Sequence, residues 1–183
     1  VITGGPDRAE LSRHKAYGDL RRFARTLHVH DRLVFTGRIS PDDWAELLRS
    51  ADLVVNSAPY EPVGTAAIQA MACGTPVVAA TAGAERDAVI DMTTGLLVAG
   101  RQPGQLALRI RRLLANSMQL EAYGIAAADR ARSRYSWERI GRETLAAYDC
   151  IRRGPAPTAA IRDAEPVRAP ALRARPIPAG APA

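Results

Sequence analysis

Short apolar runs alternate with amphipathic helical patterns along most of the chain. The apolar runs are RLVFTG at residues 32–37, DLVVN at 52–56, PVVAA at 76–80 and GLLV at 95–98. Residues 39–51, 64–74 and 102–116 lie between or after them and have helical spacing of apolar positions. Strands rich in Val and Leu that alternate with helices are typical of βαβ units and of a parallel sheet covered on both faces. The pattern therefore predicts a doubly wound α/β domain.

The sequence also predicts where one helix begins and which faces of two other helices are apolar. Ser40 is a predicted N-cap, because Pro41 suits the first helical position and Asp42 and Asp43 would face the positive end of the helix dipole. Two helices show an apolar stripe that we expect to pack in the core. The stripes are Leu20, Phe23, Ala24 and Leu27 in one helix, and Leu106, Ile110, Leu113 and Leu114 in the other. We also expect Met71 and Cys73 in the core, Ser136 as a helix cap and Trp137 as a packing anchor.

The first residues resemble the end of a strand. Val1, Ile2 and Thr3 are followed by a predicted turn at Gly4-Gly5-Pro6 and by a helix that Asp7 would cap. A fold of this type seldom begins within a strand. We therefore expect a first strand-helix unit upstream of these residues.

Composition changes at residue 154. Residues 154–183 contain seven of the 13 prolines, no aromatic residue and no apolar period. Such a segment buries too little apolar surface to offset its ordering entropy. The sequence therefore predicts a domain over residues 1–153 and a disordered tail rich in Pro, Ala and Arg over 154–183.

Charge and cysteine content exclude several function classes. The net charge of +6 comes from 24 Arg and one Lys that are dispersed among acids, and aromatic residues make up only 5%, which disfavours nucleic-acid binding. Two cysteines and three histidines form no disulfide framework and no metal-ligand pattern. No long apolar run and no signal peptide is present, and nothing indicates membrane contact. We expect a cytoplasmic protein without a metal site.

Residues 56–80, NSAPYEPVGTAAIQAMACGTPVVAA, carry the candidate chemistry. A strand ends near Asn56, a loop then presents Glu61, and Gly64 opens a helix. In open parallel sheets, ligands bind in the crevice at the carboxyl ends of the strands. Backbone N–H groups at Val63, Gly64 and Thr65 would face an anion there, and the helix dipole would add to their effect.

This segment resembles the nucleotide-sugar-binding half of retaining GT-B glycosyltransferases of group 1, also called family 4. Their loop Glu-Pro-aromatic-Gly-Leu, second Glu and Ala-Met-Ala-x-Gly-x-Pro-Val-Val-Ala compare with EPVGT at residues 61–65 and QAMACGTPVVA at 69–79. Further matches are GGP at 4–6, VFTG at 34–37, residues 83–98, and YSWE at 135–138. The departures are Val63 for the aromatic residue, Gln69 for the second Glu, and Arg86 and Asp87 for a Pro-Glu pair.

The resemblance implies a sugar transfer from a nucleotide sugar, linked to UDP or GDP, with retention of configuration. It places Glu61 as the catalytic residue that contacts the sugar hydroxyls. It also implies donor binding by Gln69 at the ribose and by the backbone near the diphosphate. The full set of implied donor-binding residues is Glu61, Pro62, Val63, Gly64, Thr65, Gln69, Gly4 and Gly5. Enzymes of this class use no cofactor and no metal ion at the site.

Other parts of the family pattern are missing from these residues. An Arg and a Lys that neutralise the donor phosphates precede the glycine turn in the family, and a separate N-terminal domain or chain holds the acceptor. Three hypotheses remain. The first is a transferase of which this chain is the donor-binding half, and the second is an inactive nucleotide-sugar-binding module or truncated fragment that needs a partner. The third is a dinucleotide-dependent oxidoreductase. GGP at residues 4–6 lacks the Gly-x-Gly-x-x-Gly turn that the third hypothesis requires.

Overall fold

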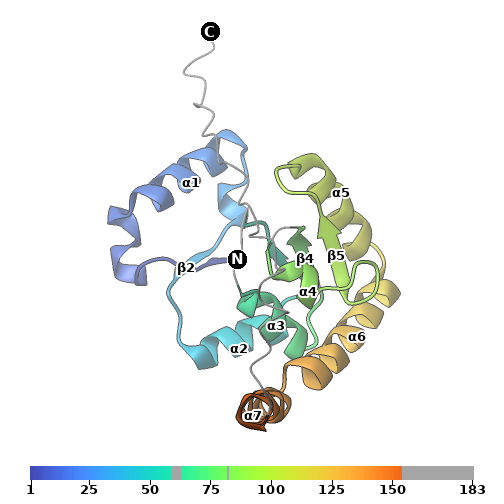
Figure 1. Ribbon diagram of the computed structural model, residues 1–183. Coiled ribbons are helices and arrows are strands. Elements are labelled where there is room, and N and C mark those ends of the chain that lie inside the picture. The colour runs from blue at the N-terminus through green and yellow to red at the C-terminus, as the bar shows by residue number, and fades with distance from the viewer. Residues whose placement is uncertain (59–62, 82, 154–183) are drawn as a thin grey trace. The chain divides into compact units, whose positions relative to one another are not determined.

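The computed structural model describes residues 1–58, 63–81 and 83–153 (Figure 1). Its strands are β1 (Ile2–Thr3), β2 (Phe35–Gly37), β3 (Val54–Asn56), β4 (Val77–Ala80) and β5 (Gly95–Val98). Its α-helices are α1 (Lys15–Thr26), α2 (Pro41–Ser50), α3 (Thr65–Ala72), α4 (Glu85–Ala88), α5 (Pro103–Leu114), α6 (Ser117–Tyr135) and α7 (Trp137–Arg153). The 3-10 helices η1 (Arg8–Arg13) and η2 (His30–Arg32) flank α1.

All strand pairs in the described residues are parallel, which confirms the predicted α/β class. β1 pairs with β2, and β3, β4 and β5 form a second sheet in that order. In the second sheet, Val54 lies opposite Val77, which lies opposite Gly95. A helix or a helical turn follows each strand of this sheet, as the alternating pattern in the sequence predicts.

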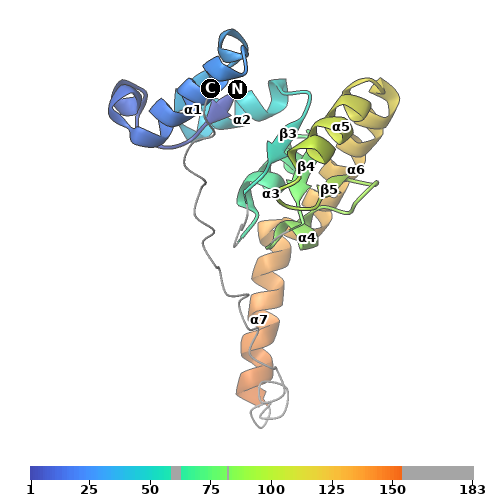
Figure 2. The ribbon, with the colours of Figure 1, turned by 90° about the horizontal axis from the view of Figure 1, so that it is seen from above.

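Two apolar clusters cover the two faces of the β3-β4-β5 sheet. Because side chains alternate along a strand, Val77 and Ala79 face one way and Val78 faces the other. The first cluster joins Val77 and Ala79 to α2, α3 and α6 through Leu48, Met71 and Ala127. The second joins Val78, Leu96 and Val98 to Leu113 of α5 and Tyr123 of α6. α6 therefore contributes to both clusters, and Figure 2 shows it beside α5 along this sheet.

Helix α6 was absent from the sequence-based expectations. Its buried residues are small apart from Tyr123, and they include Gly124, Ala127, Ala128 and Ala131. Small residues give a weak apolar period, so the pattern of large side chains did not reveal this helix. Close approach is nevertheless its role, because a Cβ at Gly124 would collide with the carbonyl oxygen of Gly74.

Several expected contacts of the apolar residues are wrong. On α1 only Ala24 is buried, whereas Leu20, Phe23 and Leu27 are exposed, with Phe23 at 61%. The physical reason is that an apolar stripe is buried only where another element covers it, and the described elements leave this one open. Leu106, Ile110 and Leu113 do pack in the core, but Leu114 is exposed. Trp137 is 83% exposed and therefore is not a packing anchor.

Helix caps agree with the sequence at two of three positions. The Ser40 Oγ accepts a hydrogen bond of 3.1 Å from the Asp43 amide, and Pro41 occupies the first turn of α2. The Ser136 Oγ accepts one of 3.4 Å from the Arg139 amide in α7. Asp7 precedes the 3-10 helix η1 instead of an α-helix, and its side chain forms no cap hydrogen bond.

The chain divides into two compact units, Val1–Arg139 and Ile140–Ala183. The first contains both sheets and helices α1 to α6, and the second contains most of α7. The predicted tail at 154–183 lies outside the described residues. Within the described residues, no helix is long and apolar enough to span a bilayer, and no cluster of His, Cys, Asp and Glu could hold a metal ion.

Candidate functional site

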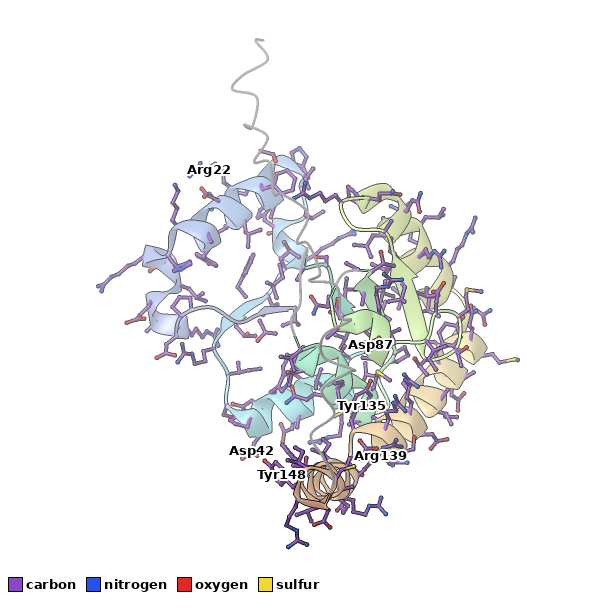
Figure 3. The ribbon with its side chains drawn as sticks, in the orientation of Figure 1. Arg22, Asp42, Asp87, Tyr135, Arg139 and Tyr148 are labelled. Atoms are coloured by element: carbon purple, nitrogen blue, oxygen red, sulfur yellow. The ribbon has the colours of Figure 1, made fainter. Side chains whose placement is uncertain are left out.

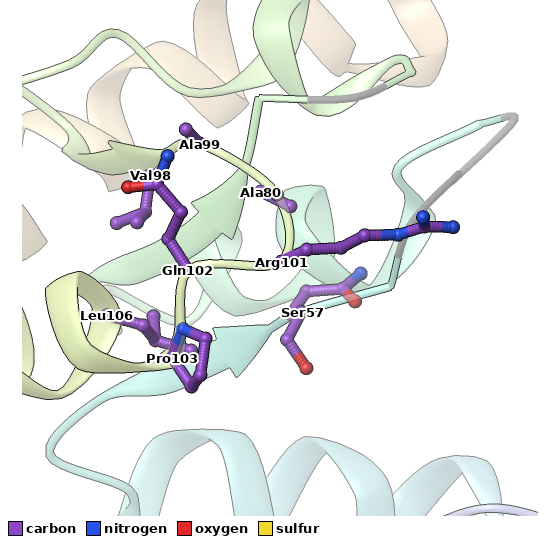
Figure 4. A pocket seen from close by; sticks show the side chains of 10 residues that line it. Ser57, Ala80, Val98, Ala99, Arg101, Gln102, Pro103 and Leu106 are labelled. Atoms are coloured by element: carbon purple, nitrogen blue, oxygen red, sulfur yellow. The ribbon is translucent and has the colours of Figure 1, made fainter. Parts of the chain in front are cut away.

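A pocket of about 330 Å³ opens at the carboxyl ends of β3, β4 and β5 (Figure 4). The three parallel strands end at one edge of the sheet, at Asn56, Ala80 and Val98. The loop after β5 and the start of α5 form the rest of the wall. The lining residues are Asn56, Ser57, Ala80, Val98, Ala99, Gly100, Arg101, Gln102, Pro103 and Leu106. This edge is where ligands bind in open parallel α/β sheets.

Among the described residues that line this pocket, Arg101 is the one with a charged side chain. Its backbone has a φ of 61°, in the left-handed region that non-glycine residues seldom adopt. Figure 4 shows its side chain on the loop after β5, and the Ser57 side chain, which follows β3, lines the same pocket. The Asn56 Oδ1 accepts a hydrogen bond of 3.2 Å from the Ala58 amide and so fixes the first turn of the loop after β3.

The sequence reasoning missed Arg101, Asn56 and Ser57. Each lies directly at or after the carboxyl end of a strand, so a census of the residues that follow each apolar run would have found them. The family motifs indicated the turn after β1, the loop after β3 and helix α3, but not the loop after β5. The contribution of the loop after β5 follows from strand order, which places β5 next to β4.

Gly64 is the N-cap of α3, as the sequence predicts. Its φ of 70° lies in the left-handed region, and the residue is buried. A Cβ at this position would lie 3.6 Å from the backbone carbonyl carbon of Ala84, so the start of α3 closely approaches the loop before α4. The first turn of a helix has N–H groups without carbonyl acceptors inside the helix, and its dipole favours an anion. Thr65, the first residue of α3, is exposed at this end.

The structure brings together only some of the predicted site residues. Val63 and Thr65 are exposed on either side of Gly64 at the start of α3. Gly4 and Gly5 form a turn after β1, with φ values of 104° and 89°, and belong to the other sheet. Glu61 and Pro62 lie outside the described residues.

Gln69 is exposed on α3, and its side chain has a defined partner. The Trp44 Nε1 donates a hydrogen bond of 2.8 Å to the Gln69 Oε1, which connects α2 to α3. No pattern in the sequence predicts this pair. The single side-chain oxygen of Gln69 is therefore already used as an acceptor within the protein.

Side chains of helix α6 donate hydrogen bonds to backbone carbonyl groups at the carboxyl end of α4. The Arg130 Nε and Nη2 donate hydrogen bonds of 2.7 and 2.6 Å to the carbonyl oxygens of Ala88 and Asp87. The Tyr135 hydroxyl donates one of 3.1 Å to the same Asp87 oxygen (Figure 3). In α4 the Glu85 side chain is completely buried. These contacts anchor the segment whose preceding loop faces Gly64.

The sequence matches a family model and many curated proteins. The model described as glycosyl transferases group 1 matches residues 1–130. A D-inositol 3-phosphate glycosyltransferase of Corynebacterium kroppenstedtii is 36% identical over 156 residues, covering 85% of this chain and 34% of that protein. A protein of the same name from Geodermatophilus obscurus is 38% identical over 147 residues, covering 80% and 31%. The chain thus spans about a third of the length of the curated relatives it matches.

Solved structures show the same fold. Sucrose-phosphate synthase of Thermosynechococcus elongatus superposes with a TM-score of 0.73 and 30% identity, covering 81% of this chain and 37% of that chain. HepE of Anabaena in complex with UDP superposes with a TM-score of 0.72 and 25% identity, covering 80% and 39%. Both coverages extend well beyond the pocket, so the likeness concerns the arrangement of the elements and not one motif.

Proposed function

The chain belongs to the glycosyl transferases of group 1, and from this membership we propose that it is the donor-binding part of an enzyme that transfers a sugar from a nucleotide sugar with retention of configuration. The donor is a UDP- or GDP-linked sugar. The acceptor is held by another domain or chain, and the reaction takes place in the cytoplasm without a metal ion or cofactor.

The observation that carries this proposal is the start of α3 at Gly64. A left-handed glycine N-cap directs the first helical turn toward the carboxyl edge of the sheet, and this geometry suits a diphosphate. HepE, which has this fold at 25% identity, was solved with UDP bound. We assign the diphosphate to the backbone at Val63, Gly64 and Thr65, and to the turn at Gly4 and Gly5.

The remaining roles follow the family motif. Glu61 contacts the hydroxyls of the transferred sugar, and Pro62 shapes the loop that presents it. Gln69 contacts the ribose. Because its Oε1 already accepts the Trp44 indole N–H, the ribose would share that oxygen or take the amide Nε2, whose hydrogen bonds are weaker than those of a carboxylate.

Departure of the nucleoside diphosphate is the main electrostatic demand of such a reaction. Negative charge that develops on the leaving oxygens needs a cation or oriented dipoles nearby. Arg101 lies at the same edge of the sheet as the start of α3, and it lines one pocket with Asn56 and Ser57 at the end of β3. We assign Arg101 to long-range neutralisation of the diphosphate, in support of the helix dipole.

Calorimetric titration with UDP, GDP and UDP-glucose tests the donor site. We expect Gln69→Glu to tighten UDP or GDP binding by a few-fold, because a carboxylate can accept from Trp44 with one oxygen and from the ribose with the other, a gain of about 1 kcal/mol. Gln119→Glu on α6 adds the same charge away from this edge and is the matched control. We expect Glu61→Gln to weaken binding of UDP-glucose and to leave UDP unaffected.

Equal affinity in Gln69→Glu and the parent chain would show that residue 69 is not a ribose ligand. Failure of the parent chain to bind any of the three nucleotides at millimolar concentration would contradict the donor site as a whole.

A second candidate function is a binding module that holds the nucleotide sugar but does not turn it over. The bond between Trp44 and Gln69 favours it, because Gln69 already accepts the indole N–H and would hold the ribose less firmly than a free carboxylate. Release of UDP from UDP-glucose, measured by a coupled assay on the chain joined to an acceptor domain, distinguishes the two. Turnover supports the transferase, and binding without turnover supports the module.

A further inference from the structure

Trp44 and Gln69 join helix α2 to helix α3 close to where each helix begins. Trp44 is the fourth residue of α2, and Gln69 is the fifth of α3. α2 follows β2 and α3 follows β3, so both helices start beyond the carboxyl end of a parallel strand. Ligands of open α/β sheets bind at that end of the strands. The pair therefore lies on the side of the domain where a ligand is expected.

The hydrogen bond between these residues fixes which way the Gln69 amide faces. An indole N–H only donates, so the group that receives it must be the amide oxygen and not the amide nitrogen. The Trp44 Nε1 lies 2.8 Å from the Gln69 Oε1, as this rule requires. The Nε2 group is the other branch of the same planar amide and is turned away from the indole nitrogen. Gln69 thus presents hydrogen-bond donors, and not its acceptor, to a ligand.

Packing holds the indole in this position. Trp44 is half-buried and packs against the first apolar cluster, as does Ile68 of α3. Leu48 of α2 and Met71 of α3 are buried members of that cluster, at 2% and 0% exposure. Both helices are therefore anchored in one core, and the indole N–H cannot leave residue 69 without disturbing that core.

A ribose offers neighbouring hydroxyl groups at C2′ and C3′, and each can donate and accept. A carboxylate at residue 69 would have about four lone-pair sites, enough to accept from Trp44 and from both hydroxyls. The Gln69 amide, with its oxygen bonded to Trp44, donates only, and one hydroxyl oxygen is enough to receive its Nε2. Because Gln69 is exposed, an N–H that lacks a hydroxyl partner stays hydrated. Loss of one hydroxyl therefore leaves no buried group unpaired.

We propose that Trp44 is a positioning residue that sets donor specificity, and that the site accepts donors built on 2′-deoxyribose as readily as donors built on ribose. The inference rests on the proposed function, in which Gln69 contacts the ribose. A site strongly rejects an analogue that lacks a hydroxyl only where a protein group then loses its partner. Trp44 removes that requirement, because it occupies the acceptor of Gln69. The donor class therefore includes 2′-deoxynucleoside diphosphate sugars, such as a dTDP-linked sugar.

The test compares UDP with 2′-deoxy-UDP, which differ in one hydroxyl group, by calorimetric titration of the 183-residue chain. We expect dissociation constants within about threefold of each other. In Gln69→Glu, UDP should bind more tightly than 2′-deoxy-UDP by about tenfold or more, because the carboxylate accepts from both hydroxyls. Gln119→Glu makes the same charge change on α6 and should keep the ratio of the parent chain. A stronger preference for UDP in the parent chain, or an unchanged ratio in Gln69→Glu, would overturn the proposal.

Trp44→Phe tests the positioning role itself. Phe keeps an aromatic ring against the cluster but removes the N–H, so the Gln69 Oε1 becomes available to a ribose hydroxyl. We expect the preference for UDP over 2′-deoxy-UDP to rise by about threefold or more. Loss of folded protein lowers both titrations equally, so a merely structural effect does not move this ratio. Trp137→Phe on α7, where the side chain is 83% exposed, is the matched control and should keep the parent ratio.

A ratio in Trp44→Phe equal to that of the parent chain would contradict the role of Trp44. Should this variant fail to fold, the comparison of the parent chain with Gln69→Glu still decides the proposal.

Tryptophan emission gives a readout that leaves both residues of the pair intact. The chain contains two tryptophans, so Trp44 is the sole tryptophan of Trp137→Phe. We expect UDP and 2′-deoxy-UDP both to change its emission, with midpoints that agree with calorimetry. Heat of binding without a change in emission would place the nucleotide away from Trp44 and would overturn the proposal.

Failure of this inference and failure of the proposed function give different results. If neither nucleotide binds, the donor site is contradicted and this inference is wrong with it. If UDP binds and 2′-deoxy-UDP is rejected, the donor site stands and the specificity role of Trp44 alone is wrong.

Discussion

Gly124→Ala tests the close contact between α6 and the turn that joins α3 to β4. A Cβ at residue 124 of α6 would collide with the carbonyl oxygen of Gly74 and would lie 3.7 Å from the Pro76 Cδ. Gly74 is in the turn that joins α3 to β4, and its own φ of 78° is in the left-handed region. The colliding atom belongs to the backbone, so it cannot move aside by a change of rotamer. α6 or the turn must shift instead.

The change in the free energy of unfolding combines an overpacking cost with a gain in helix propensity. Overpacking of a close contact costs about 1–3 kcal/mol. Replacing Gly by Ala within a helix gains up to about 1 kcal/mol. Because the colliding atom is backbone, we take the overpacking cost from the upper part of its range, about 2–3 kcal/mol, which leaves a net loss of roughly 1–2 kcal/mol in the free energy of unfolding. For a chain of this size, this loss lowers the melting temperature by roughly 2–8 °C.

Gly18→Ala is the matched control, because Gly18 lies inside α1 and a Cβ there meets nothing within 4 Å. Only the helix-propensity term applies, so this variant should be more stable than the parent by up to about 1 kcal/mol. Urea unfolding followed by far-ultraviolet circular dichroism measures both. Gly124→Ala at or above the stability of the parent would refute the contact between α6 and the turn.

Three further predictions concern single side chains. Arg130→Met should lower the unfolding free energy by about 1–3 kcal/mol in urea titrations, because two backbone carbonyls lose a charged donor, whereas Arg132→Met should have almost no effect. Thr75→Val should cost about 1–2 kcal/mol in the same assay, because the Leu48 carbonyl loses its hydrogen bond from the Thr75 hydroxyl. Arg101→Ala should weaken UDP binding a few-fold in calorimetry, with a smaller difference at high salt and an unchanged melting temperature.

Local signals in the sequence predicted the local structure well. Ser40 and Pro41 fix the start of α2 through backbone chemistry that needs no distant partner. Gly64 at the start of α3 is also predicted from local backbone chemistry, since its left-handed φ favours glycine. The four apolar runs became strands β2 to β5, because Val and Leu suit a sheet covered by helices.

Burial and site assembly could not be predicted in the same way. Phe23 and Leu113 occupy similar places in amphipathic helices, yet only Leu113 has a sheet beneath it. The pocket residue Arg101 and the bond between Trp44 and Gln69 depend on which elements become neighbours. The helical period of one segment contains no information about its neighbours. The predicted roles of Glu61 and Pro62 fall on residues outside those described and stay predictions.

The double role of α6 in the core has a consequence for synthesis on the ribosome. Strands β3, β4 and β5 follow one another in the chain and in the sheet, so their pairing requires only short loop closures. Both apolar clusters still depend on α6, one through Ala127 and Ala131 and the other through Tyr123. A nascent chain that has released β5 but not α6 therefore exposes apolar surface on both sides of the sheet. Chaperone binding should be strongest in that interval and should end once Ala131 has left the exit tunnel.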